Sequence, residues 1–246
     1  MIKQIPNILT SLNLLCGCVA VLFVVSGDLI VVAYFVVLGI IFDFLDGLAA
    51  RLLKTQSKTG LQFDSLADMV TSGLVPGLVM LQLLNVSIFG NTMTISETFS
   101  TSSLNNGFSN YVPFVGLLVT VASGYRLAKF NVDIRQTDSF IGLPTPANTL
   151  LILSLPLILE FQNSHLIESV ILNKWFLLGV ILVSCILLNS KIHLFALKFK
   201  TWDFKNNAIR YVFLLLSLIA LILMKFIAIP IIITLYIVIS VFQKIR

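Results

Sequence analysis

The sequence predicts an all-α, polytopic integral membrane protein, a helical bundle of about eight spans with both termini on the cytoplasmic side. The 246 residues are 58% hydrophobic and only 11% charged, with a mean hydropathy of +1.02. An ordinary soluble domain carries about 25% charged residues, so a water-soluble fold of this size could not cover so much apolar surface. In lipid, helices satisfy their own backbone polar groups, which favours helices over open sheets.

Apolar segments long enough to cross a bilayer, or nearly so, follow one another along the chain, each crossing needing about 20 mostly apolar residues. The first segment lacks a small-residue cleavage site after it and is expected to be a retained helix. Between the third and fourth, residues 91–110 are rich in Ser, Thr and Asn and are expected to form an exposed loop. The expected spans are 8–26, 30–52, 62–85, 112–130, 147–161, 175–189, 208–224 and 227–243.

The basic residues give the expected orientation, because cytoplasmic loops collect Lys and Arg. With the N-terminus inside and the sides alternating, all of the 16 basic residues except Lys174 and Lys225 fall on the inner side. A missed or extra helix would scramble this division. The net charge of +5 therefore reflects membrane topology, and no nucleic-acid partner is expected.

The spans divide into a six-helix core over residues 1–190 and a C-terminal helical hairpin over residues 208–246. The basic stretch between them, 191–207, mixes Lys with Phe, Leu and Trp around Lys191–Trp202. It fits either an amphipathic helix lying on an anionic leaflet or a plain cytoplasmic loop.

Four aspartates lie where the second expected helix ends and the third begins. A charged side chain at the centre of a spanning helix costs about 2.5–3.5 kcal/mol on insertion scales, so such residues are rare without a function. Asp43 and Asp46 are three residues apart and Asp64 and Asp68 four apart, so each pair shares a helix face. Two antiparallel helices can therefore direct all four carboxylates into one space near the cytoplasmic side.

Four unpaired carboxylates would repel one another strongly, and a hard divalent cation such as Mg²⁺ or Mn²⁺ would relieve that conflict. Gly47, Ala50 and Gly60 leave room for a bulky ligand beside the acids, and Arg51 supplies a charge suited to a phosphate. The spacing alone leaves other interpretations open: a structural ion-pair cluster, or the proton or cation relay of an ion or metabolite transporter.

Read as a string, the region is Asp43-x-x-Asp46-Gly47-x-x-Ala50-Arg51, then eight residues, then Gly60-x-x-x-Asp64-x-x-x-Asp68. It resembles the signature of the CDP-alcohol phosphatidyltransferase family, with every motif position filled. The resemblance implies a CDP-activated lipid whose pyrophosphate binds divalent metal ions, two of them in such enzymes. The hydroxyl of an alcohol attacks the phosphorus attached to the lipid, and CMP leaves.

The resemblance also assigns roles to single residues. The metal ligands would be Asp43, Asp46, Asp64 and Asp68, and Asp68 would also be the base for the acceptor hydroxyl. Contacts to the nucleotide and its phosphates would come from Asn7, Thr10, Gly47, Ala50, Arg51 and Gly60. For Asn7 and Thr10, helix capping at the membrane surface is the alternative.

Three further stretches resemble the phosphatidylserine synthase branch of that family: Pro6–Gly17, Tyr125–Asn131 and Phe140–Asn148. This implies CDP-diacylglycerol as donor and L-serine as acceptor, an enzyme of the cell membrane with its site facing the cytoplasm, and a homodimer. The serine carboxylate would be held by one or more of Arg126, Lys129 and Arg135, with Arg126 favoured.

Several alternatives remain at the acceptor. The three basic residues could equally be ordinary positive-inside residues. Lys129 stands where the branch commonly has Arg, which keeps the charge and loses the bidentate geometry. Glycerol 3-phosphate or an inositol phosphate would demand a denser basic pocket, and the sequence leaves both open as acceptors.

Overall fold

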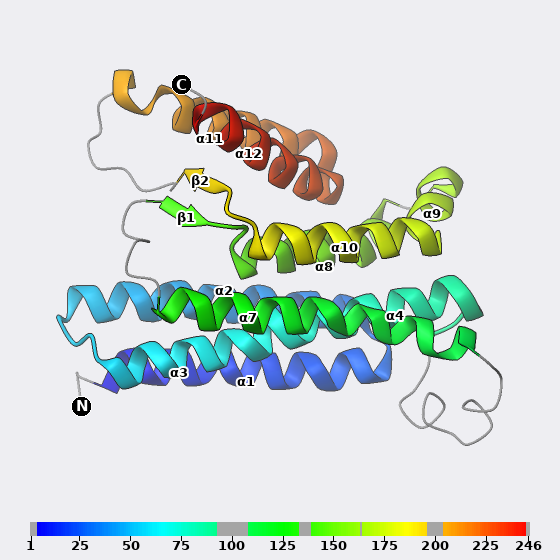
Figure 1. The fold of residues 1–246 in the computed structure, drawn as a ribbon, viewed down its shortest axis with the longest axis horizontal. Helices are drawn as coiled ribbons and strands as arrows, with labels where there is room; N and C mark the ends of the chain where they lie inside the picture. The colour runs from blue at the N-terminus through cyan, green and yellow to red at the C-terminus, as the bar shows by residue number, and fades with distance from the viewer. Residues whose placement is uncertain (1–3, 93–107, 133–138, 163, 196–203, 245–246) are drawn as a thin grey trace.

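The computed structural model describes residues 4–92, 108–132, 139–162, 164–195 and 204–244, and it is a bundle of long helices (Figure 1). Helix α1 (Ile5–Ser26) begins with a proline in its first turn and ends at Gly27, whose φ of 84° suits glycine. Asp28 then caps α2 (Leu29–Leu52) by accepting a hydrogen bond from the Val31 N–H at 3.2 Å. The tight connection makes α1 and α2 antiparallel neighbours.

The third stretch that is long and apolar enough to cross a membrane has 32 residues, Lys58–Phe89, and consists of three helical segments. Ser57 caps its start, and the Ser57 hydroxyl accepts a hydrogen bond from the Gly60 N–H at 2.9 Å. The segments are α3 (Lys58–Asp68), the π-helical η2 (Met69–Leu74) and α4 (Val75–Phe89). Asp68 is therefore the last residue before the π-helical segment.

The second half of the chain packs along helices α1 to α4 (Figure 1). Its elements follow one another in the sequence as η3, α7, β1, α8, α9, α10 and β2, and α11 and α12 form an outer hairpin. The bounds are η3 (Phe108–Leu117), α7 (Leu118–Val132), β1 (Ser139–Ile141), α8 (Thr145–Phe161), α9 (His165–Ile171), α10 (Lys174–Asn189), β2 (His193–Phe195), α11 (Phe204–Met224), η4 (Lys225–Ile227) and α12 (Ala228–Lys244).

The all-α expectation is confirmed except for one short antiparallel ladder, in which Phe140 of β1 lies opposite Leu194 of β2. Strands of three residues are too short to give a periodic signal in the sequence. The ladder lies within or beside two stretches that were expected to be turn or loop. Of the basic stretch 191–207, residues 196–203 lie outside the described residues, and α11 already begins at Phe204.

Five helical stretches in the described part of the chain are long and apolar enough to cross a membrane, or six if the bent pair α9 and α10 counts as one. Helix α8, with 17 residues, is shorter. The stretch Arg210–Phe242 counts once, although α11 and α12 lie as a hairpin in Figure 1. A polytopic membrane protein is therefore confirmed, and the number of eight crossings stays a prediction. Most of the expected loop 91–110, residues 93–107, lies outside the described residues.

Close packing at one point fixes α1, α2 and η2 together. Thr71 of η2 is fully buried, and its methyl and hydroxyl lie against Gly17 of α1 and Gly39 of α2. Its hydroxyl donates to the Asn13 carbonyl at 3.1 Å. A larger residue at either glycine would push the π-helical segment away from the other two helices.

We expect Gly39→Ala to destabilise the protein, because a Cβ there would lie 2.8 Å from Cγ2 of Thr71 and 3.0 Å from Oδ1 of Asn13. Overpacking of this kind costs about 1–3 kcal/mol. The measurement is the thermal unfolding midpoint in detergent. Gly179→Ala in α10 is the matched control, since nothing lies within 4 Å of its Cβ position and both variants gain the same helix propensity. Equal midpoints for the two variants would contradict this packing.

Candidate active site

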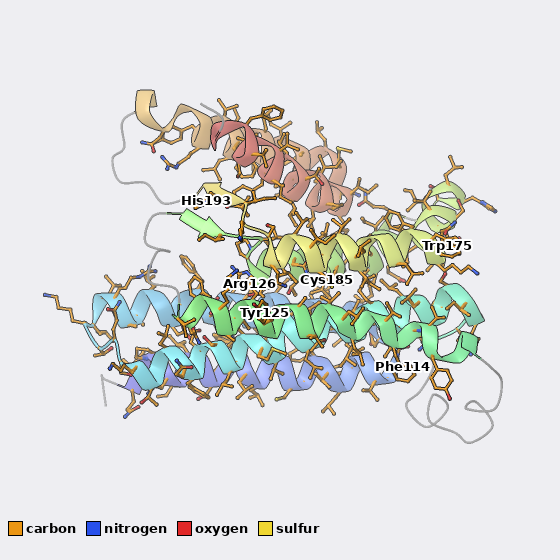
Figure 2. The ribbon with its side chains drawn as sticks, in the orientation of Figure 1. Phe114, Tyr125, Arg126, Trp175, Cys185 and His193 are labelled. Atoms are coloured by element: carbon orange, nitrogen blue, oxygen red, sulfur yellow. The ribbon has the colours of Figure 1, made fainter. Side chains whose placement is uncertain are left out.

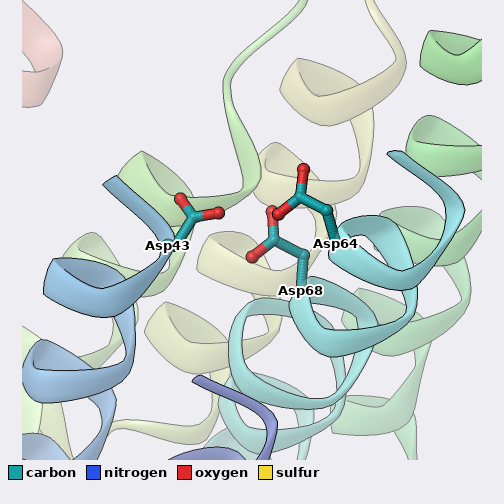
Figure 3. A group of neighbouring side chains, drawn as sticks. All are labelled: Asp43, Asp64 and Asp68. Carbon is teal, nitrogen blue, oxygen red and sulfur yellow. The ribbon is translucent and has the colours of Figure 1, made fainter. Parts of the chain in front are cut away.

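Three of the four predicted aspartates converge between α2 and α3, two helices that both pack on α1. One carboxylate oxygen each from Asp43, Asp64 and Asp68 lies within 4.8 Å of the others, and all three side chains are half-buried (Figure 3). Asp64 and Asp68 reach this point together because residues four apart share a helix face. Carboxylates this close repel one another unless a cation or protons intervene.

The fourth aspartate, Asp46, lies beside this group and is engaged with α1. It is buried, and its Oδ2 accepts a hydrogen bond from the Thr10 hydroxyl at 2.5 Å. One turn further along α1, the Asn13 amide donates to Oδ1 of Asp68 at 3.3 Å. Helix α1 therefore fixes two of the acids through two polar side chains on one face. The role of Asn13 was missed in the sequence, where its only signal was an amide inside an apolar helix.

A cleft of about 640 Å³ opens beside the acids. Ligand pockets in proteins commonly measure about 300–1,000 Å³. No atom lies within 4 Å of the position that a Gly47 side chain would take, so the helix backbone is accessible there. The lining includes every residue expected to contact the nucleotide and three of the acids: Asn7, Thr10, Asp43, Asp46, Gly47, Ala50, Arg51, Gly60 and Asp64.

The charges of the cleft are arranged by depth. Its acids are buried or half-buried, whereas Arg51 and Lys58 are exposed at its edge. Such a gradient suits a ligand whose anionic groups bind cations at the bottom and basic side chains at the rim. Lys58, Thr55 and Ser57 line the cleft as well and were not singled out in the sequence, because loop residues between two helices carry no periodic signal.

Arg126 is the basic residue that α7 directs into the protein (Figure 2). Its side chain is only 7% exposed, its guanidinium carbon lies 5.9 Å from the ring centre of Phe130, and its charge interacts with that of Asp68. One guanidinium nitrogen donates to the Thr145 hydroxyl at 3.4 Å. Arg126 and the half-buried Lys129 both line a small cavity of about 10 Å³. Arg135 lies outside the described residues.

Further buried polar groups lie on η2, α7 and α8, three segments that contact one another. Buried polar atoms normally have a hydrogen-bond partner, so a cluster without partners suits a bound ligand or water. Within the described ranges, the side-chain atoms that are buried here without a partner are Ser72 Oγ, Ser123 Oγ, Arg126 Nε and both amide atoms of Asn148. The sequence did not single out Ser72, Ser123 or Asn148 individually as site residues, because each is a common residue in an apolar helix.

The donor set fits a hard divalent cation. The converging groups are carboxylates alone, and Mg²⁺ and Mn²⁺ prefer oxygen ligands. Oδ1 of Asp64 is buried without a partner among the described residues, which leaves a lone pair for a ligand bond. The residues that could hold a metal are therefore Asp43, Asp64 and Asp68, with Asp46 adjacent.

Comparison with known proteins identifies the family of the chain. Residues 3–187 match the family model described as CDP-alcohol phosphatidyltransferase, a range that contains every site residue named above. Relatives named CDP-diacylglycerol–serine O-phosphatidyltransferase include one from Helicobacter pylori strain J99, 31% identical over 73% of this chain and 69% of the relative. Another, from Methanocaldococcus jannaschii, is 31% identical over 74% of this chain and 72% of the relative. A third, from Bacillus subtilis, is 29% identical over 58% and 70%.

We expect Mn²⁺ or Mg²⁺ to raise the thermal unfolding midpoint of the protein in detergent and EDTA to reverse the rise. A ligand at 100 times its dissociation constant stabilises the folded state by about 2.7 kcal/mol. Asp64→Asn should remove most of this response, because it takes one charge and one ligand oxygen from the cluster. Asp28→Asn is the control, since Asp28 is exposed and Asn also caps helices. An undiminished response in Asp64→Asn would exclude this cluster as the metal site.

Proposed function

The chain belongs to the CDP-alcohol phosphatidyltransferase family, and on that premise we propose that it transfers a phosphatidyl group from CDP-diacylglycerol to L-serine. The products are phosphatidylserine and CMP, so the protein acts in phospholipid biosynthesis. The observation that carries the proposal is the cleft in which the carboxylates meet Gly47 and Arg51. The relatives with this activity support serine as the acceptor.

In this proposal the cleft holds the CDP group. The residues Asn7, Thr10, Gly47, Ala50, Arg51 and Gly60 contact the nucleotide and its phosphates, and Asp43, Asp46, Asp64 and Asp68 hold two divalent ions, Mg²⁺ or Mn²⁺. Bound metal would neutralise the pyrophosphate and stabilise the leaving CMP. The open backbone at Gly47 lets the nucleotide approach the helix closely, and Arg51 at the rim offers a fixed charge to a phosphate.

Asp68 is the proposed base. The serine oxygen forms a bond to the phosphorus that carries the lipid, the bond from that phosphorus to the CMP oxygen breaks, and Asp68 takes the hydroxyl proton. The hydrogen bond from Asn13 leaves the second carboxylate oxygen of Asp68 for this proton and orients the group. The same carboxylate can also contribute to metal binding.

Arg126 is the proposed partner of the serine carboxylate. It is buried, it interacts with Asp68, and its Nε has no partner among the described residues. Lys129 lies beside it, and we retain Arg135 as a candidate as well. A phosphorylated acceptor such as glycerol 3-phosphate or an inositol phosphate would call for more cations around this point. An ion or metabolite transporter is the alternative of another class, and the named relatives favour the enzyme.

The topology proposed with this function has eight crossings, both termini in the cytoplasm and the cleft facing the cytoplasm from the cell membrane. The distribution of basic residues supports it, because the acids lie at the same end of their helices as Arg51, Lys54 and Lys58. That side is where serine and nucleotides are available. A homodimer is proposed from the family alone.

We expect the purified protein with CDP-diacylglycerol and Mn²⁺ or Mg²⁺ to release CMP when serine is added. Glycerol 3-phosphate and inositol phosphate should give little release. Asp68→Asn should abolish turnover, because it removes the base and keeps the shape. Without metal, its thermal midpoint should equal or exceed that of the unmodified protein, because one of the repelling charges is gone. Release with glycerol 3-phosphate and not with serine would refute the acceptor, and no release with any alcohol would refute the enzyme.

We expect Arg126→Gln to raise the KM for serine by about 10–100-fold, since a hydrogen bond to a charged group contributes about 1.5–3 kcal/mol. The KM for CDP-diacylglycerol should change much less, because Arg126 is not among the residues that line the large cleft. CMP release at varied concentrations of each substrate measures both constants. Lys174→Gln, at an exposed position at the start of α10, is the control for a lost positive charge. Parallel changes in both constants would argue against carboxylate binding by Arg126.

A further inference from the structure

The helix that carries Asp64 and Asp68 has a defect in its backbone hydrogen bonding just beyond the acids. In η2 the Val75 N–H donates to the Val70 carbonyl, five residues back, as in a π-helix. The next residue is Pro76, which has no N–H to give. The carbonyl of Ser72, four residues before Pro76, therefore loses its α-helical donor at a depth where an unpaired backbone group costs several kcal/mol.

A side chain from another helix supplies the missing donor. The Thr149 hydroxyl of α8 lies 2.9 Å from the Ser72 carbonyl oxygen and is fully buried. It lies equally close, 2.9 Å, to the carbonyl of Thr145 in its own helix. A hydroxyl has one proton, and the Thr145 carbonyl already has the N–H of residue 149 as its α-helical donor. The proton therefore serves the Ser72 carbonyl, which has no such donor.

A second threonine supports the same segment. The Thr120 hydroxyl of α7 donates to the Gly73 carbonyl at 3.1 Å. Gly77 makes this approach possible, because the position of its missing Cβ is occupied by the Thr120 hydroxyl. Together with the hydrogen bond from Thr71 to Asn13, these contacts connect the π-helical segment to α1, α7 and α8. The segment that follows Asp68 is thus fixed by side chains on three sides.

We propose that Thr149 is a positioning residue: by donating to the Ser72 carbonyl it maintains the π-helical turn and so holds Asp64 and Asp68 against Asp43. A π turn contains one residue more than an α turn, so its return to α geometry would rotate the acids by about 100° relative to α4. That rotation would remove them from the cluster. The inference rests on the proposed function for its catalytic consequence and on the carboxylate cluster for its effect on metal binding.

The test compares Thr149→Val, which keeps the shape and removes the donor, with Thr149→Ser, which keeps the donor. Changes in the groups that orient metal ligands typically lower metal affinity or activity about 10–100-fold. We expect a loss of that size in kcat for CMP release with Thr149→Val, with smaller changes in the KM for either substrate. The metal concentration that gives half of the rise in thermal midpoint should increase by a similar factor. Thr149→Ser should behave like the unmodified protein.

Thr234→Val in α12 is the matched control, because the Thr234 hydroxyl bonds a carbonyl of its own helix, that of Pro230, at 2.8 Å. It should change neither kcat nor the metal response. If Thr149→Val does not yield folded protein, Thr149→Ala against Thr149→Ser gives the same comparison.

The proposal is overturned if the variants without the hydroxyl keep kcat and metal response within about twofold of the Ser variant, well short of the expected range. If kcat and the metal response fall as far in Thr149→Ser as in Thr149→Val, the proposal is overturned too, because the serine variant keeps the hydroxyl donor. If the unmodified protein releases no CMP with any alcohol, the proposed function fails, and the thermal response to metal still decides the role of Thr149.

Discussion

The mutual repulsion of the carboxylates that α2 and α3 direct toward one another is the constraint on which the other features of the site depend. Asp43, Asp64 and Asp68 are held within 4.8 Å of one another in a half-buried position, where charge interactions are stronger than in water. Hydrogen bonds from α1 and the charge of Arg126 offset only part of this repulsion. A bound divalent cation would relieve the rest of the repulsion, so the cluster is suited to hold one.

Holding the acids in that arrangement places a demand on the backbone. The stretch from Lys58 to Phe89 does not satisfy all of its own carbonyls, because it contains a π-helical turn followed by Pro76, which has no N–H. Thr120 and Thr149 donate to carbonyls of the turn, and Thr71 of the turn donates to α1. Three glycines make room for Thr71 and Thr120. Irregular helices in membranes commonly rely on Ser and Thr side chains in this way. Here the irregular turn begins directly after Asp68, which suggests that helix regularity is given up in favour of the position of the acids.

The sequence predicted the site residues that are close together along the chain, and it did not predict their partners from distant helices. Asp43, Asp64 and Asp68, with Gly47 and Arg51, could be assigned to one site because residues on one helix face recur every three or four positions. The partners of those residues come from far along the chain: Asn13 bonds Asp68 across 55 positions, and Thr149 bonds Ser72 across 77. No periodicity reports such pairs, since they arise only when the helices pack. The β1–β2 ladder was not predicted either, because its strands of three residues are too short to give a periodic signal.

The first turns of α8 contact both the proposed serine-binding residue, Arg126, and the segment that follows the proposed base, Asp68. Thr145 accepts from Arg126, the proposed partner of the serine carboxylate, and Thr149, on the same face, donates to the turn that positions Asp68. A serine that binds Arg126 through its carboxylate must present its hydroxyl to Asp68 a few bonds away, so the two side chains have to keep a fixed separation. One rigid helical segment that contacts both sides can maintain that separation. This accounts physically for the conspicuous sequence Phe140–Asn148, whose Gly142 and prolines bring the chain from β1 into the start of α8. If Arg126 binds the serine carboxylate as proposed, the position of α8 contributes to acceptor selection together with the charge of Arg126.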